Sequence, residues 1–354
     1  MDFSLFYLPT WRREYTSTLT EYYEELIESV RLADRLGWAR AMSTEHHFHY
    51  YGGPVPNPAV LLAALARETT KIRLAAGVSL VPLRHPLQVA EDYAMVDQLS
   101  GGRFDMGISR GFVPHEFEAF GIDRAETAER VSEAIDIIQR FWKGEPFEFQ
   151  GRFHQFKRLM PWPRPIQSDI PIWIAASNDR LSFERAGAAG LPLMMNQYPM
   201  SFESLAEKHR WYCDAYAAAG HDPAQRRSAV AFMTCVADDE ETAVQRAGLP
   251  LAEHADAFVK LIGHREWDDE YPTDLSGLGG LAGAGDPLAL VRERTLLCSP
   301  AQAAERLERY ARLGFTEAIF ATRFGAMPAE YCTQTMERLS HEVRPLLEGR
   351  LSRR

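Results

Sequence analysis

Eight short apolar segments alternate along the chain with segments of helical periodicity, and this alternation constrains the fold more than any other feature. The apolar segments lie at residues 3–7, 39–44, 72–81, 103–109, 172–176, 193–196, 228–237 and 318–320. Amphipathic segments follow at residues 20–36, 57–65, 86–99, 125–142, 181–189 and 205–219, after residue 239 and at the C-terminal end. The apolar segments have little polar alternation, which is typical of strands covered on both faces. Eight strand–helix units predict a parallel sheet closed into a (β/α)8 TIM barrel.

Two segments depart from this alternation. Residues 147–156 alternate around Gly151, a pattern that predicts an inserted hairpin. Residues 266–287 are acidic and then glycine-rich, and we interpret the region of about 263–290 either as a mobile lid over the barrel mouth or as a disordered surface insertion. These glycines do not form a GxGxxG motif after a strand, so a dinucleotide-binding site is not predicted. No linker divides the chain, and we expect one domain over residues 1–354.

Composition excludes several classes of protein. The formal net charge is −10, which disfavours a non-specific nucleic-acid binder. None of the four cysteines forms a CxxC pair, so neither a zinc ribbon nor a dithiol site is expected, and free thiols suit a reducing cytoplasm. The N-terminal residues do not resemble a signal peptide, and no apolar run is long enough to span a membrane. We therefore expect a cytoplasmic protein that binds neither nucleic acid nor membrane.

The residues after the second predicted strand include three histidines within residues 46–49. Catalytic groups of such barrels lie on the loops at the C-terminal ends of the strands. A histidine there can exchange a proton near neutral pH, and we single out His46 for this role. The alternative is a set of histidines that satisfy buried polar groups or face solvent. No HExxH or other helical metal spacing accompanies them, so we predict no metal site.

Polar residues also follow the fourth and fifth predicted strands. Ser109 and Arg110 end the fourth strand beside a glycine, a setting that suits an anionic ligand such as phosphate or, alternatively, a salt bridge at the rim. Ser177 and Ser182 flank the start of the helix after the fifth strand, where backbone N–H groups can bind phosphate. The alternative for these serines is simple helix capping. Together these groups predict a base, an arginine and a phosphate site at one barrel mouth.

Several of these motifs resemble one known family. They are EHHF at residues 45–48, NPAV at 57–60, the tract LVPLRHPLQVAEDYAMVDQLSGGRFDMGISRG at 80–111 and GLPLMM at 190–195. FQGRFHQF at residues 149–156 and PWPRPIQSDIPIWIAAS at 161–177 complete the set. They resemble the alpha chain of bacterial luciferase and the luciferase-like flavin-dependent monooxygenases, in the same order, from about residue 3 to residue 345. The glycine-rich segment lies where luciferase has its mobile lid.

The resemblance implies an activity and its partners. Enzymes of this family bind reduced FMN that a separate reductase supplies, and the flavin reacts with O2 at its C4a atom. The hydroperoxide formed there oxygenates a small organic substrate, which we expect to come from secondary metabolism. The resemblance also implies a homodimer packed through helices near residues 57–67 and 86–99.

The same resemblance assigns roles to residues near the flavin ring. His46 corresponds to the catalytic base, and Glu116 to an acidic residue close to the flavin. Ser109 stands where luciferase has a reactive cysteine. Gly77 and Val78 correspond to the pair joined by a non-proline cis peptide beneath the isoalloxazine.

Four residues correspond to contacts of the flavin phosphate. Arg110 matches the phosphate-binding arginine, and Ser177 and Ser182 match the phosphate hydroxyls. A second arginine is expected on the helix at residues 125–142, and Arg130 is the candidate. An F420-dependent oxidoreductase of the same fold and a non-catalytic flavin-binding subunit are the alternatives. Retention of EHHF, Arg110 and Ser177 argues against the subunit, because such a subunit has no chemical need for them.

Overall fold

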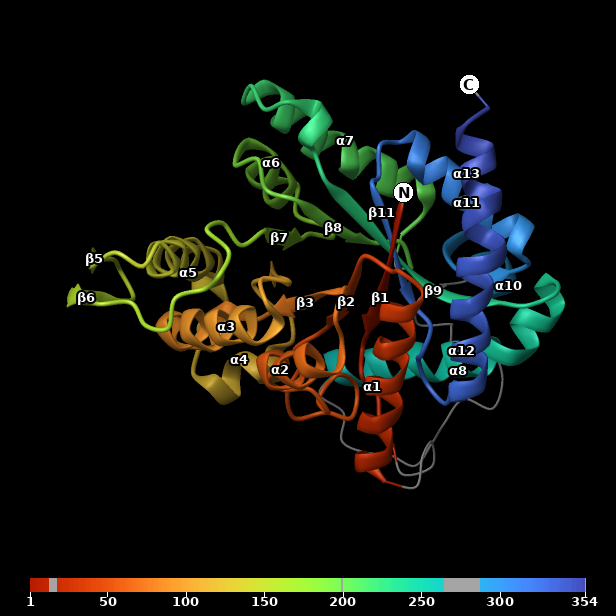
Figure 1. Cartoon of the computed structure of the whole chain (residues 1–354), viewed down its shortest axis with the longest axis horizontal. Helices are drawn as coiled ribbons and strands as arrows, with labels where there is room; N and C mark the ends of the chain where they lie inside the picture. The colour runs from red at the N-terminus through yellow and green to blue at the C-terminus, as the bar shows by residue number, and fades with distance from the viewer. Residues whose placement is uncertain (13–17, 199, 264–286, 354) are drawn as a thin grey trace.

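Eight parallel strands close on themselves and are surrounded by helices in the computed structural model (Figure 1), which describes residues 1–12, 18–198, 200–263 and 287–353. The strands pair in the order β1-β2-β3-β4-β7-β8-β9-β11, and β11 pairs again with β1. Their bounds are β1 (Asp2–Tyr7), β2 (Arg40–Ser43), β3 (Arg73–Ser79), β4 (Phe104–Ile108), β7 (Ile172–Ala175), β8 (Leu193–Asn196), β9 (Ser228–Val236) and β11 (Glu317–Ala321). The predicted TIM barrel is therefore confirmed, with each predicted strand in place.

Helices cover the outside of the barrel (Figure 1). The α-helices are α1 (Leu19–Arg35), α2 (Pro58–Glu68), α3 (Pro86–Ser100), α4 (Pro114–Phe120), α5 (Thr127–Trp142), α6 (Arg180–Ala188), α7 (Phe202–Ala218), α8 (Glu240–Gly263), α10 (Pro287–Arg294), α11 (Pro300–Arg312), α12 (Ala329–Arg338) and α13 (Arg344–Leu351). Short 3-10 turns lie at η1 (Val81–Leu83), η2 (Arg124–Glu126) and η3 (Pro223–Gln225), and a π-helical turn at η5 (Leu339–Val343). Asn57 caps α2 ahead of Pro58, as predicted.

Four elements were missed from the sequence. β10 (Leu296–Cys298) pairs in parallel with the second half of β9, beyond the part of β9 that pairs with β8 and β11. It has only three residues, too few for a periodic pattern. The helices α4, α10 and α11 were also not predicted. The inserted hairpin is present as β5 (Phe147–Gln150) and β6 (Gln155–Leu159). The predicted lid falls largely on residues 264–286, which lie outside the described residues.

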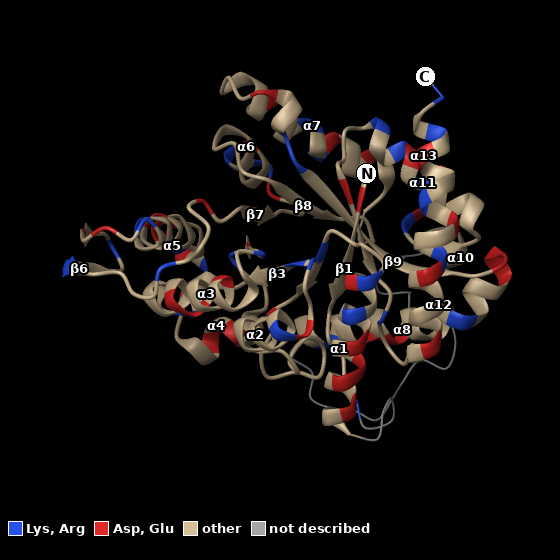
Figure 2. Ribbon diagram, viewed as in Figure 1, with Lys and Arg blue, Asp and Glu red and all other residues tan. Residues whose placement is uncertain are grey.

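The main hydrophobic core lies between the barrel and its helices. Tyr93 of α3, for example, stacks on Phe104 of β4 with 4.7 Å between ring centroids. A smaller cluster, which includes Met42, Trp173 and Ile319, is formed by side chains of the barrel strands. Charged residues of both signs are spread over the outer helices (Figure 2). No helix within the described ranges is long and apolar enough to cross a membrane.

A buried ion cluster fills the barrel at the N-terminal ends of the strands. Arg40, the first residue of β2, donates from Nε to Asp105 Oδ2 at 2.6 Å and from Nη1 to Glu317 Oε2 at 2.6 Å. All three side chains are at most 4% exposed. Ser4 Oγ donates to Glu317 Oε1, and the Arg40 guanidinium lies 4.5 Å from the centroid of the Trp173 ring. The cluster thus joins β1, β2, β4, β7 and β11.

The charge of Asp105 depends on its arginines. Burial alone would raise the pKa of this carboxyl, but Arg40 and Arg73 outweigh burial and hold its pKa below the usual value. A lowered pKa in the folded state means that the carboxylate stabilises the protein above its unfolded pKa. This contribution is lost as the pH falls through the folded pKa.

Replacing Arg40 tests the cluster. We expect Arg40→Met to reduce the free energy of unfolding by about 3–5 kcal/mol at pH 7, because Asp105 and Glu317 would stay buried beside each other without Arg40. The loss should shrink toward pH 5, as protonation relieves the uncompensated charge. Urea denaturation measures both effects. Arg140→Gln, which removes an exposed arginine paired with Asp136 on α5, is the control and should leave the unfolding midpoint unchanged. Equal midpoints for the two variants would contradict a structural role for the cluster.

Candidate active site

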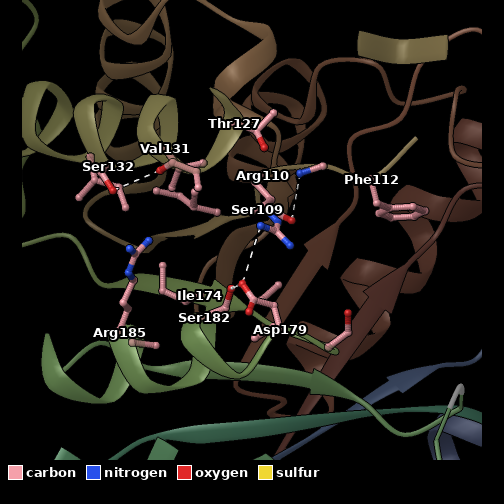
Figure 3. Close-up of a pocket in the computed structure, with 18 of the residues that line it drawn as sticks. Ser109, Arg110, Phe112, Thr127, Val131, Ser132, Ile174, Asp179, Ser182 and Arg185 are labelled. Carbon is pink, nitrogen blue, oxygen red and sulfur yellow. Dashed lines mark hydrogen bonds and ion pairs between the residues drawn. The ribbon is translucent and has the colours of Figure 1, made fainter. Parts of the chain in front are cut away.

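A cavity of about 800 Å³ opens beyond the C-terminal ends of β4 and β7, between α5 and α6 (Figure 3). Its apolar wall includes Ile108, Val131 and Ile174. Its polar wall is formed by residues that follow the two strands and by the facing sides of the two helices. The polar and charged lining residues are Ser109, Arg110, Arg124, Thr127, Ser132, Ser177, Asn178, Asp179, Ser182 and Arg185.

The charges in this cavity are mostly positive. Among the described residues, three arginines line it, Arg110, Arg124 and Arg185, against a single carboxylate, that of Asp179. Arg110 Nη1 lies 3.8 Å from Asp179 Oδ2. Arg124 and Arg185 form no ion pair with any residue that the structure describes. Figure 3 shows the Arg185 side chain extending from α6 toward α5. Cationic groups without a partner carboxylate, at the edge of a cavity, are suited to an anionic ligand.

The N-terminus of α6 faces the same cavity. Asp179 caps this helix by accepting from the N–H of Leu181 at 3.2 Å, and Ser182 Oγ donates to Asp179 Oδ2 at 3.0 Å. Helix N-termini carry unpaired N–H groups and a partial positive charge that favour anions. With the three arginines, this end of the cavity can hold a phosphate group.

Four of the predicted phosphate-site and catalytic residues meet in this cavity, namely Ser109, Arg110, Ser177 and Ser182. Arg130 does not join them. Its Nη2 donates to Glu126 at 3.0 Å and its guanidinium lies 4.1 Å from the centroid of the Phe153 ring. Arg124 and Arg185 line the cavity instead, and they replace Arg130 as candidates. Arg185 could have been found from the sequence, because it is three residues after Ser182 and so shares its helix face.

His46 and Glu116 form a buried pair beside the cavity. His46 Nδ1 lies 3.1 Å from Glu116 Oε1, which also accepts from the backbone N–H of His47 at 2.8 Å. Glu116 is in the first turn of α4, where the helix dipole stabilises a carboxylate. Its second oxygen, Oε2, is buried with no hydrogen-bond partner among the residues that the structure describes. The pair orients the imidazole through Nδ1, and Nε2 has no hydrogen bond to a described residue.

The order of the strands relates this pair to the cavity. His46 follows β2, the cavity lies beyond β4 and β7, and β3 lies between them. The peptide bond between Gly77 and Val78 near the end of β3 is cis, as the family resemblance implies. His46, Glu116, Gly77 and Val78 do not line the cavity themselves. Phe112 connects the two regions, because it lines the cavity and its ring centroid is 5.7 Å from that of His46.

The three histidines after β2 face different partners. His47 Nε2 lies 3.4 Å from Glu45 Oε1, whereas His49 Nδ1 accepts from the N–H of Tyr51 at 3.1 Å. Glu45 also accepts from Ser79 Oγ and from the N–H of Leu80, both at 3.1 Å, and so ties the end of β2 to the end of β3. Within the described part of the chain, no group of three or more His, Cys, Asp or Glu residues is arranged to hold a metal ion.

Aromatic residues form a wall on the other side of His46, and sequence reasoning missed their partners on α8. The ring centroid of Tyr51 is 5.9 Å from that of His46 and 5.0 Å from that of His254. Burial lowers the pKa of His254 to about 3, so its imidazole is neutral at pH 7. His254 Nδ1 and the hydroxyl of nearby Tyr198 are buried and have no hydrogen-bond partner in the described part of the chain. This wall is therefore apolar, with two polar atoms that remain unsatisfied.

Known proteins provide an independent comparison. A model of the family described as luciferase-like monooxygenase matches residues 1–317. The chain belongs to this family. Membership confirms the resemblance that the motifs after the second and fourth strands first indicated, and with it the prediction of a luciferase-like monooxygenase.

Similar proteins match all or nearly all of the chain. The oxygenase component of a flavin-dependent trigonelline monooxygenase from Acinetobacter baylyi is 30% identical, covering 100% of this chain and 98% of its own length. The crystal structure of monooxygenase RslO1 from Streptomyces bottropensis has a TM-score of 0.84 at 28% identity, covering 98% of this chain and 99% of its own. The oxygenating constituent of 3,6-diketocamphane monooxygenase from Pseudomonas putida, solved in complex with FMN, has the same fold, with a TM-score of 0.79 at 23% identity and 98% coverage of both chains.

Gly52 confines His46, and its replacement should disturb the site. Gly52 has φ +77°, and a Cβ built on it would lie 2.6 Å from His46 Cβ. We expect Gly52→Ala to lower the free energy of unfolding by about 1–2 kcal/mol, because alanine is strained in the left-handed backbone conformation. The clash between the added Cβ and His46 should lower it further. Gly220→Ala is the matched control, because Gly220 has φ +81° and no atom within 4 Å of an added Cβ. Urea denaturation should show the larger loss for Gly52→Ala, and equal losses would mean that the loop does not confine His46.

Proposed function

We propose that this protein is the oxygenase component of a two-component flavin-dependent monooxygenase. It would receive reduced FMN from a separate reductase and use O2 to oxygenate a small organic substrate, which we place in secondary metabolism. The observation that carries the proposal is the cavity at the barrel mouth, where three arginines and the N-terminus of α6 face an apolar wall. The relative from Acinetobacter baylyi, itself named an oxygenase component, supports a two-component system.

The residues present are suited to FMN. Arg110, Arg124 and Arg185 would bind its phosphate, together with the hydroxyls of Ser177 and Ser182. Two of these arginines have no ion pair with a described residue, so a phosphate would supply a counter-charge that the chain does not. Gly77 and Val78, at the end of β3, would lie against the isoalloxazine. F420 would require the same anion site but would make the reaction a hydride transfer without O2.

The chain's own groups account for the proton chemistry. Reduced flavin, when bound, would supply the two electrons for the activation of O2. Glu116 holds His46 through Nδ1, so that Nε2 can take up or release a proton at the barrel mouth. Ser109 Oγ accepts from the N–H of Gly111 at 3.3 Å, which leaves its hydroxyl hydrogen available as a donor in the cavity. Burial of His46 and Glu116 limits the access of water to this pair.

The aromatic residues beside His46 suggest the nature of the substrate. Tyr51, Phe112 and Phe258 provide aromatic surface, and His254 is neutral. A wall without charge favours an organic molecule with apolar or aromatic surface. We propose that the substrate lies between this wall and the flavin.

The chain would work as one domain in a reducing compartment. β1 pairs with β11, and Arg344 of α13 lies over the Phe3 ring, so the two ends of the chain are part of one barrel. This arrangement supports a single domain over residues 1–354. All four cysteines are free, and we propose a cytoplasmic location, where thiols stay reduced.

We also propose a homodimer through α2 and α3. Val60 of α2 is 68% exposed, and Met95 and Leu99 of α3 are 53% and 38% exposed, which leaves apolar surface without a described partner. Sedimentation at micromolar concentration should give twice the mass of the chain, and the double variant Val60→Glu, Met95→Glu should give a monomer. Leu346→Glu, on exposed Leu346 of α13, is the control and should remain dimeric. A monomeric wild-type protein would rule out the dimer.

Mixing with reduced FMN and O2 tests the proposed activity. We expect the protein to bind reduced FMN and to give a near-ultraviolet absorbing species that decays more slowly than with free reduced FMN. His46→Ala should change that lifetime, and it should reduce substrate oxygenation by about 100-fold or more, because a positioned acid–base group contributes on this scale. His341→Ala, which removes an exposed histidine on the π-helical turn, is the control and should behave as wild type.

Two results would overturn this proposal. One is that the protein does not bind reduced FMN and does not change the rate at which reduced FMN reacts with O2. The other is binding of F420 with hydride transfer that consumes no oxygen, which would favour an oxidoreductase on the same barrel.

A further inference from the structure

The proposed phosphate site already contains an anion of the chain itself. The Asp179 carboxylate lies at the N-terminus of α6, beside Ser182 and Arg110 (Figure 3). It accepts from Leu181 N–H at 3.2 Å and from Ser182 Oγ at 3.0 Å, and it lies 3.8 Å from Arg110 Nη1. These donors are among those that a phosphate would use. Asp179 therefore already contacts Ser182 and Arg110, two of the groups that a phosphate would bind.

The negative charge of Asp179 is not needed to start the helix. Asparagine and serine cap helices about as well as aspartate, because a neutral side-chain oxygen accepts the same N–H group. The charge instead acts on the cavity, where Asp179 is the single carboxylate among three arginines. A phosphate dianion that enters must either displace this carboxylate from Ser182 and Arg110 or bind close to it. Both routes reduce the affinity for the phosphate.

We propose that Asp179 is a built-in competitor for the flavin phosphate, which keeps FMN binding weak enough for rapid exchange. This inference rests on the proposed function, since a two-component oxygenase must take up reduced flavin and release oxidised flavin in each cycle. Affinity differences among related complexes arise mainly in the dissociation rate, so a weaker phosphate contact speeds release. Arg124 and Arg185 have no carboxylate partner among the described residues, so their positive charges remain available to attract the phosphate.

The solvent exposure of Asp179 and Arg110 allows a phosphate to replace the Asp179 carboxylate. The side chains of Asp179 and Arg110 are 42% and 49% exposed, so the carboxylate can rotate toward solvent without disturbing the core. On release of flavin the carboxylate returns to Ser182 and Arg110, which keeps these donors satisfied. Competition by Asp179 requires a phosphate on the ligand. The affinity for a flavin without phosphate should therefore not depend on the charge of residue 179.

Binding of oxidised FMN and of riboflavin, measured by flavin fluorescence quenching or calorimetry, separates an effect on the phosphate from an effect on the flavin ring. Asp179→Asn retains the cap and removes the charge. We expect it to lower the Kd for FMN by roughly five- to tenfold, as for removal of one like charge from a half-exposed site, and to slow FMN release. The Kd for riboflavin should not change.

Two arginine variants show whether the site itself is correct. Arg185→Ala should weaken binding of FMN and not of riboflavin. Arg180→Ala is the matched control, because Arg180 is on the same helix but does not line the cavity, and it pairs with Glu184 and lies over the Trp211 ring. Arg180→Ala should leave the Kd for FMN and the Kd for riboflavin unchanged.

The outcomes distinguish the two proposals. If Arg185→Ala weakens FMN binding but Asp179→Asn leaves it unchanged or weakens it, the competitor role is overturned and the phosphate site stands. The same holds if Asp179→Asn tightens FMN and riboflavin equally, since the charge would then not act on phosphate. If wild type binds FMN no better than riboflavin and Arg185→Ala changes neither, both the phosphate site and the competitor role are overturned.

Discussion

The guanidinium of Arg40, buried between Asp105 and Glu317, closes the N-terminal end of the barrel, and the rest of the structure depends on this closure. A closed parallel barrel leaves only its opposite end for ligands, because all strand C-termini meet there. The cluster places charges deep in the protein, where they are stable only as a set. The polar residues of the candidate site accordingly lie on segments that follow β2, β4 and β7.

The barrel mouth combines two different environments. On one side, arginines and the N-terminus of α6 favour a phosphate. On the other side, the buried His46–Glu116 pair and aromatic rings favour proton transfer next to an organic molecule. Phe112 lies between them. This separation is suited to a ligand with a charged tail and a planar reactive ring, as FMN has, and Asp179 moderates how firmly the charged tail is held.

Much of this arrangement was predictable from local patterns. The strands are apolar because both of their faces are covered, so the sequence predicted all eight barrel strands. Ser109, Arg110, Ser177 and Ser182 were predicted because they follow strands, and position after a strand determines position at the mouth. The role of Arg130 stays a prediction. Arg130 lies on the expected helix, but its side chain contacts Glu126 and Phe153 and is not among the residues that line the cavity, and the direction of a side chain cannot be read from a motif.

The sequence alone determined the barrel, the family and the identity of the polar groups at its mouth, because these depend on periodicity and on short contiguous motifs. Tertiary structure decided which of those groups meet. Glu116 contacts His46 although the two are 70 residues apart, and α4, which carries Glu116, is too short to leave a periodic pattern. Arg124 and Arg185 reach one cavity from different elements. Asp179 is an ordinary helix cap in the sequence, and only its place among three arginines makes its charge matter to a ligand, since electrostatic energy depends on distance in space.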